Sequence, residues 1–425
     1  MKVRVLLCGV CFSVCRALAA TDCIQPSYCD ALDYATLCDG VYTQQPHSTI
    51  GCDGVAPFES PKEDGDGFYA SVTCKDGEYV VAFRGTELSK GQDLLDDLDQ
   101  GLNGNNKQFS LASDYVNDLM DVLNKCNLKG SVTLTGHSLG GSLAQYAATQ
   151  VPDSSRLSVI AFNPGALLPV GASQKFHGCA FNYVHPNDIL YRTVNPLLRE
   201  ASKVDPNVAP GYIGDTIPLG PGGGPIDYSA ANLTKEDVER LRTPEFRNEL
   251  EQLFAAIKTF QNAPNWQAGV WRSKGYAGSL ISLGWRVLSS PLLVKILDPM
   301  LSAETRDKLR KLDEVAGKDY HWWAEAKKSI DIVKAMSEAI LGIVDDVNRQ
   351  VDGHLLKSPG GTIEILDGKC KKEKAGVMPP ARPGPPDATI LPLPSPLPPT
   401  HPSITNSSGP IGGTVKPAEG GGNRR

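Results

Sequence analysis

The sequence lacks the features expected of a nucleic-acid-binding protein or of a membrane-spanning one. Its 42 Lys and Arg side chains are outnumbered by 48 Asp and Glu, and no basic run is long enough to form a nucleic-acid-binding surface. Residues 270–297 are apolar, but Lys and Arg side chains interrupt them, so they do not predict a transmembrane helix. These absences argue against a DNA or RNA partner and a membrane span, and they leave a globular protein with a net charge of −6.

The first 19 residues have the composition of an export signal. Lys2 and Arg4 give a positive start, residues 5–15 are apolar, and Ala17–Ala19 fits a cleavage site. The apolar stretch is too short to span a bilayer, so a signal peptide over residues 1–19 is favoured over a membrane anchor. We therefore expect a secreted or periplasmic protein. Its mature chain would have lost three positive side chains and no negative ones, for a net charge near −9 (39 against 48).

Eight cysteines follow this segment, and none of them forms a Cys-x-x-Cys pair with another, which disfavours a zinc site. An even number of cysteines in an exported chain favours disulfides instead. Four of the eight lie between residues 23 and 52, as if they stapled a segment without a core of its own. The sequence leaves their connectivity open. The eight are Cys23, Cys29, Cys38, Cys52, Cys74, Cys126, Cys179 and Cys370.

Apolar runs rich in β-formers alternate with helical patterns over the first half of the chain. An order of strand, helix, strand predicts an α/β fold, in which a mostly parallel sheet is covered by helices on both faces. A main domain over residues 20–370 would hold this sheet. The expected strands are 68–74, 79–84, 132–135, 157–162 and 181–184, and the expected helices are 27–42, 109–126 and 142–149.

The second half of the chain has a different character. Residues 216–342 are mostly helical in pattern and would form an inserted cap, with all five tryptophans between Trp266 and Trp323. These indoles suit a lid at a lipid–water interface, and they suit the core of a helical subdomain equally well. Residues 362–366 read as a last strand. Residues 371–425 contain 13 Pro among 55 residues and predict a disordered tail.

Gly136-His137-Ser138-Leu139-Gly140 lies between a predicted strand and a predicted helix. A sharp turn with glycine two residues on either side of a serine, in that context, is a nucleophile elbow. The glycines are needed because side chains at those positions would meet neighbouring backbone. The turn exposes the serine hydroxyl and aims the N-terminus of a helix at it, where free N–H groups can stabilise an oxyanion.

A serine nucleophile needs a general base and an acid that orients the base, and in this architecture the acid follows the serine in the chain. Asp188 comes just after a predicted strand, 50 residues beyond Ser138. Its position fits the acid. An aspartate that merely caps the turn after Pro186 is the alternative.

Four motifs together resemble the class 3 (fungal-type) lipase family: residues 83–86 (FRGT), 93–99 (DLLDDLD), 136–141 (GHSLGG) and 187–189 (NDI). The resemblance covers residues 79–190. It implies an α/β-hydrolase-like fold that hydrolyses acyl esters of lipids without a cofactor. It also implies an oxyanion hole made of Thr86 and the backbone N–H of Leu139, and an elbow His137 that points away from the substrate and is not the base.

Two histidines can supply the base after Asp188, since His401 falls in the predicted tail. His354 follows the helical region in a loop-like stretch with apolar residues after it, as in the resembled family, and it is the favoured base. His321 opens a predicted helix and is the alternative. A chain with neither would be a non-catalytic, lipid-binding relative. The sequence therefore predicts an exported serine hydrolase of lipid esters, and it leaves triacylglycerol and phospholipid open as substrates.

Overall fold

The computed structural model describes residues 23–43, 48–64, 67–75, 77–85, 107–165, 176–208, 211–221, 223–261, 290–316 and 330–377. Several predictions fall outside these residues. They are the export signal over residues 1–19, the oxyanion-hole Thr86, the five tryptophans, the alternative base His321, and all of the predicted tail beyond residue 377.

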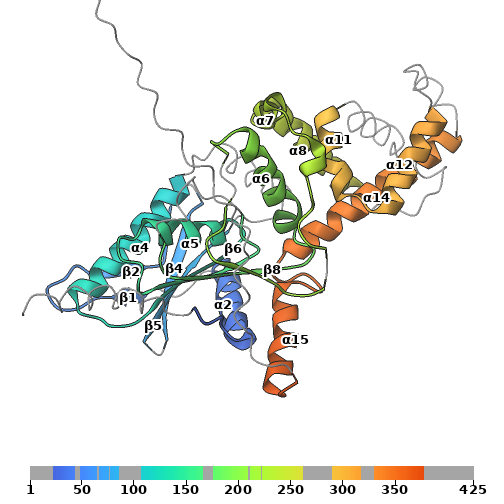
Figure 1. The fold of residues 1–425 in the computed structure, drawn as a ribbon. Helices are drawn as coiled ribbons and strands as arrows, with labels where there is room; N and C mark the ends of the chain where they lie inside the picture. Colours follow the sequence, from blue (N-terminus) through green and yellow to red (C-terminus); the bar gives the residue numbers. More distant parts are fainter. Residues whose placement is uncertain are drawn as a thin grey trace, which may run out of the picture. The chain divides into compact units, whose positions relative to one another are not determined.

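A twisted sheet lies between helices in this fold (Figure 1). It has seven strands in the order β3-β4-β5-β6-β7-β8-β9. The strands from β5 to β9 are parallel, and β3 and β4 add an antiparallel edge. This arrangement confirms the predicted, mostly parallel α/β sheet. The strands are β3 (Lys62–Glu63), β4 (Tyr69–Lys75), β5 (Glu78–Phe83), β6 (Val132–His137), β7 (Leu157–Phe162), β8 (Cys179–Val184) and β9 (Asp215–Pro218). A separate antiparallel pair joins β1 (Ser48–Ile50) to β2 (Phe58–Ser60).

The sheet is covered by helices on both faces. Alternate side chains of a strand point to opposite faces, and β7 shows the result. Val159 and Ala161 pack in the core that holds α4 (Lys107–Lys125) and α5 (Leu139–Gln150). Ile160 and Phe162 pack instead with α2 (Tyr28–Gly40) and α15 (Thr362–Lys374). Burial on both faces explains why the central strands read as continuous apolar runs rather than alternating ones.

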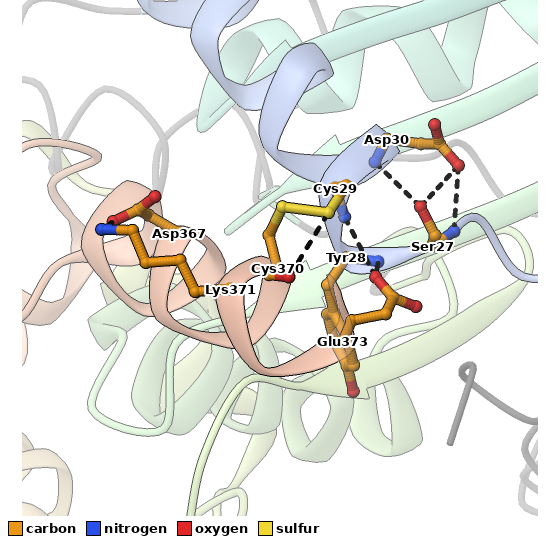
Figure 2. Close-up of a disulfide and its surroundings, with 8 residues drawn as sticks. All are labelled: Ser27, Tyr28, Cys29, Asp30, Asp367, Cys370, Lys371 and Glu373. Atoms are coloured by element: carbon orange, nitrogen blue, oxygen red, sulfur yellow. Dashed lines mark hydrogen bonds and ion pairs between the residues drawn. A yellow bond between two sulfur atoms is a disulfide. The ribbon is translucent and has the colours of Figure 1, made fainter. Parts of the chain in front are cut away.

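Helices α2 and α15 lie side by side although more than 300 residues separate them (Figure 2). A disulfide joins Cys29 of α2 to Cys370 of α15. The Glu373 carboxylate accepts hydrogen bonds from the backbone N–H groups of Tyr28 (3.0 Å) and Cys29 (3.4 Å). A carboxylate at that place is favourable because the N-terminus of α2 has unsatisfied N–H groups and a partial positive charge.

The prediction of a strand at residues 362–366 is wrong, because these residues form the first turns of α15. Their β-branched side chains favour a strand locally, but Leu366 and Cys370 are buried four residues apart against α2. That spacing fits a helix and not a strand. The helix ends at Lys374, three residues beyond the predicted start of the tail at residue 371.

Among the described residues there are three disulfides, which agrees with the expectation of disulfide bonds. Besides Cys29–Cys370, they are Cys23–Cys179 and Cys52–Cys126. They do not staple the N-terminal segment to itself, as the crowding of its cysteines suggested. Each joins that segment to a distant element, namely β8, α15 or the end of α4. Cys38 and Cys74 carry free thiols.

The second half of the described chain is helical and builds a core of its own. The helical part differs from the predicted 216–342 insertion at both ends. Strand β9 keeps residues 215–218 in the sheet, and α14 continues as far as His354. Among the described helices, none is long and apolar enough to cross a membrane. The helices are α6 (Asn195–Val204), α7 (Lys235–Leu241), α8 (Pro244–Gln261), α11 (Pro291–Leu297), α12 (Ala303–Ala316) and α14 (Ile330–His354).

Candidate active site

Ser138 occupies the turn between β6 and α5. Its φ of 57° and ψ of −128° lie outside the regions that a serine ordinarily adopts, which is the strained geometry of a nucleophile elbow. The flanking glycines make this turn possible. A Cβ atom on Gly136 would come within 2.2 Å of the carbonyl of Gly140, and one on Gly140 would come within 2.3 Å of the Phe83 oxygen.

The backbone N–H of Leu139, the predicted oxyanion-hole donor, belongs to the first turn of α5. Leu139 is the first residue of α5 and follows Ser138 directly. The first N–H groups of a helix have no acceptor within the helix, and they carry its partial positive charge. The second predicted donor, Thr86, lies outside the described residues.

The structure brings His354 and Asp188 together. Nδ1 of His354 lies 2.5 Å from Oδ1 of Asp188, and both side chains are buried. The aspartate is itself held, because its oxygens accept hydrogen bonds from the backbone N–H groups of Leu190 (3.3 Å) and Tyr191 (2.8 Å). Asp188 thus caps the turn after β8 and also contacts His354. A cap of this turn and a partner of the histidine, the two alternatives for this residue, are therefore compatible.

The position of His354 differs in one respect from the expectation. The residue ends α14 and does not lie in a loop. Its Nε2 atom is buried and has no hydrogen-bond partner within the described part of the chain. When Nδ1 of a histidine ring donates to a carboxylate, Nε2 is the nitrogen left to accept a proton.

The three side chains are closed off from solvent. Ser138, Asp188 and His354 are each 0 % exposed. Burial strengthens the electrostatic interaction between Asp188 and His354.

His137 lies against the ring of His354. The two ring centroids are 4.8 Å apart, and Nε2 of His137 lies 2.7 Å from the carbonyl oxygen of His354. Burial, together with the neighbouring His354, lowers the pKa of His137 to about 3. His137 is therefore neutral near pH 7, and its Nε2 carries the proton that it donates to this carbonyl.

Two residues of this site were not predicted from the sequence. Asn163, at the end of β7, donates hydrogen bonds from its amide to the backbone of Gly353 and His354. Gly353 touches the loop that carries Asp188 so closely that a Cβ atom would lie 2.6 Å from Nδ1 of His185. The sequence contained little that could have identified Asn163 or Gly353. Asn163 ends a buried strand, but nothing in the sequence links it to residues about 190 positions later.

Comparisons with known proteins relate the chain to lipid-hydrolysing enzymes. A family model described as a Tle-like phospholipase domain matches residues 33–167, which include Ser138 but neither Asp188 nor His354. No curated protein sequence matches significantly. The family model supports a lipase-like α/β-hydrolase, whereas the class 3 lipase family stays a resemblance.

Solved structures of fungal lipases are also similar. A lipase from Rhizopus microsporus var. chinensis is 15% identical, with 38% of this chain and 67% of that chain covered and a TM-score of 0.28. A triacylglycerol lipase from Penicillium expansum is 19% identical, with 45% and 79% covered and a TM-score of 0.32. A lipase–propeptide complex from Rhizomucor miehei is 18% identical, with 40% and 64% covered and a TM-score of 0.29. At these identities and TM-scores the likeness leaves the substrate open.

Proposed function

We propose that this protein is an exported serine hydrolase that cleaves carboxylic ester bonds of lipids with Ser138, His354 and Asp188. The observation that carries the proposal is the 2.5 Å contact between His354 Nδ1 and Asp188 Oδ1, in a fold whose elbow presents Ser138. It favours an enzyme over a non-catalytic relative that has lost its base. The three disulfides support export, because such bonds persist in oxidising compartments.

The geometry suggests a division of roles. Asp188 keeps the proton of His354 on Nδ1, so that Nε2 can take the proton of the Ser138 hydroxyl as Oγ attacks the ester carbonyl. The N–H of Leu139, with Thr86, stabilises the oxyanion of the tetrahedral intermediate. The intermediate then collapses, and His354 gives its proton to the departing alcohol. Water activated by the same histidine attacks the acyl-enzyme, and the fatty acid leaves.

The family model supports one of the two candidate substrate classes, the phospholipids. The family model that matches residues 33–167 is described as phospholipase-like, which supports a phospholipase A-type enzyme that cleaves an acyl ester of a membrane lipid. Triacylglycerol is the other candidate, from the resemblance of the sequence motifs to class 3 lipases. Both substrates lie at a lipid–water interface, and both are cleaved by the same acyl-transfer chemistry.

Labelling and hydrolysis by matched variants test the proposal. The mature wild-type protein should react with a fluorophosphonate at one serine and hydrolyse a short-chain ester. Ser138→Ala and His354→Ala should each lower kcat by about 10⁴-fold or more, because the members of a triad act as a unit. His321→Ala should keep wild-type activity. A folded wild-type protein that does not react with the fluorophosphonate would contradict the proposal. If His321→Ala is inactive and His354→Ala is active, the base is His321 and not His354.

A panel of lipids then separates the two substrate classes. Phosphatidylcholine vesicles and tributyrin emulsions should be tested with the wild type and with Ser138→Ala as the blank. Release of fatty acid from the vesicles at a higher kcat/KM than from tributyrin is the result expected of a phospholipase A. The opposite order would favour a triacylglycerol lipase.

A further inference from the structure

Asn163 is a buried side chain that contacts the backbone of the proposed base, His354, and the loop that leads to the proposed acid, Asp188. It follows β7, is 0 % exposed, and has a φ of 45°. Its Oδ1 accepts a hydrogen bond from the backbone N–H of His185 (2.8 Å), in the loop that leads to Asp188. Because that partner can only donate, the amide must present oxygen to His185 and nitrogen to its other neighbours.

The nitrogen of the same amide meets the end of helix α14. Nδ2 of Asn163 donates to the carbonyl oxygen of His354 (2.9 Å), with the carbonyl of Gly353 (3.3 Å) and the hydroxyl of Thr362 (3.2 Å) beside it. The last carbonyls of a helix have no donor within the helix. Asn163 supplies one, and His137 Nε2 supplies a second to the same His354 oxygen.

We infer that Asn163 is a positioning residue for the proposed base: one amide ties the backbone of His354 to the loop of Asp188. The inference rests on the proposed function. A carbonyl held by two buried donors fixes the Cα of His354, and with it the place from which the imidazole extends. The acceptor side of the amide fixes His185, three residues before Asp188. The 2.5 Å contact between base and acid is therefore held from the backbone of His354 on one side and from His185, in the loop of Asp188, on the other.

A residue that only satisfies buried polar groups would affect stability and not turnover, so the two roles can be separated. Asn163→Asp keeps the oxygen that His185 needs and the tolerance of a positive φ, but it removes the N–H donor. The matched control is Asn182→Asp. Asn182 is also 0 % exposed and lies on the neighbouring strand β8. Its amide donates to Ile213 (2.9 Å) and contacts no residue of the proposed triad.

The experiment compares both variants with the wild type on a short-chain ester, well below their melting temperatures. Both should melt at lower temperature, because each loses a buried donor. Only Asn163→Asp should lower kcat, by about 10- to 100-fold with KM nearly unchanged, the size expected when a reacting group is displaced by up to ~1 Å. Asn163→Gly, which suits the positive φ and adds no charge, should show the same loss. Amide hydrogen exchange at residues 353–356 should rise in both Asn163 variants and not in Asn182→Asp.

Several outcomes would overturn the inference. Wild-type kcat in folded Asn163→Asp and Asn163→Gly would do so, and so would an equal loss of kcat in Asn182→Asp. If both Asn163 variants fail to fold, the residue serves folding and not the placement of the base. A wild-type protein without esterase activity is a different result, which contradicts the proposed function. The exchange measurement still tests whether Asn163 fixes the end of α14 in that case.

Discussion

Gly353 and His185 approach each other so closely that no larger residue fits at position 353. A Cβ atom there would lie 2.6 Å from Nδ1 of His185, and 2.7 Å and 2.8 Å from the carbonyl carbon and oxygen of Asn187. Two of these three atoms belong to the backbone, which cannot turn aside as a side chain can. The end of α14 is therefore pressed against the loop that carries Asp188, and the contact between His354 and Asp188 depends on this approach.

Replacement of this glycine should damage turnover. Gly353→Ala forces α14 and the 185–188 loop apart, and we expect kcat to fall by about 10- to 100-fold as the base moves relative to the acid. Steady-state kinetics on a short-chain ester, with the folded fraction measured by circular dichroism, gives the result.

A second glycine provides the control. Gly368 lies within α15, and a Cβ atom there would meet nothing within 4 Å. Gly368→Ala should leave kcat unchanged and stabilise the protein by about 0.5–1 kcal/mol, because alanine loses less backbone entropy in a helix. Wild-type kcat in Gly353→Ala would mean that the two elements can separate without consequence.

The neutral state of His137 should make stability fall in mild acid. In the folded protein its pKa is lowered to about 3, by burial first and by the neighbouring His354 second, whereas an unfolded histidine titrates near 6.5. Between these two values the unfolded chain binds more protons, so the free energy of unfolding decreases as the pH falls below about 6.5. Above pH 6.5 His137 is neutral in both states and has no such effect on stability. At pH 5 its titration lowers the free energy of unfolding by about 2 kcal/mol.

His137→Gln isolates this effect. Glutamine does not titrate, and its amide can still donate to the His354 carbonyl. His185 also has a lowered pKa, through burial, but it is present in both proteins and cancels in the comparison. Urea unfolding at pH 8 and pH 5 should show the wild type losing about 2 kcal/mol more than the variant. An equal loss in the two proteins would show that His137 does not titrate in this way.

The disulfide between Cys29 and Cys370 should contribute strongly to stability. It closes a loop of 341 residues and joins α2 to the helix that follows His354. The double variant Cys29→Ala, Cys370→Ala should lose about 2–5 kcal/mol of unfolding free energy, a typical cost of removing a native disulfide. Chemical denaturation under non-reducing conditions measures it.

Cys74 serves as the reference for this experiment. Its thiol is free and the residue is exposed on β4. Cys74→Ser should change stability by no more than about 0.5 kcal/mol, the usual range for a surface substitution. A double variant that unfolds at the same denaturant concentration as Cys74→Ser would mean that α2 and α15 hold together without the bond.

Much of the fold follows from local patterns in the sequence. Runs rich in β-forming residues identified strands such as β6 and β7, which are buried on both faces. A capping box of Thr234 and Asp237 begins α7, and a feature of this kind is readable in a sequence because both residues act within one turn. The elbow around Ser138 was predictable for the same reason. Its strand, glycines and helix are consecutive in the chain.

Local patterns misled where packing outweighed propensity. The β-branched residues at 362–365 favour a strand, but burial of Leu366 and Cys370 against α2 makes the segment helical. His354 was expected in a loop-like stretch after the helical region, but it ends α14, and Gly353 stands before it. The glycine proves to be needed for the close approach to His185 and not for a turn.

The sequence by itself determined the sheet, the elbow and the candidates for the acid (Asp188) and the base (His354 or His321). Each of these was read from residues close together in the chain. Only the tertiary structure decided which atoms meet. The contacts of His354 with Asp188, with His137 and with Asn163 span 166, 217 and 191 residues. Contacts over such distances depend on how the helices pack on the sheet. No periodicity or spacing in a single sequence encodes that packing in a readable form.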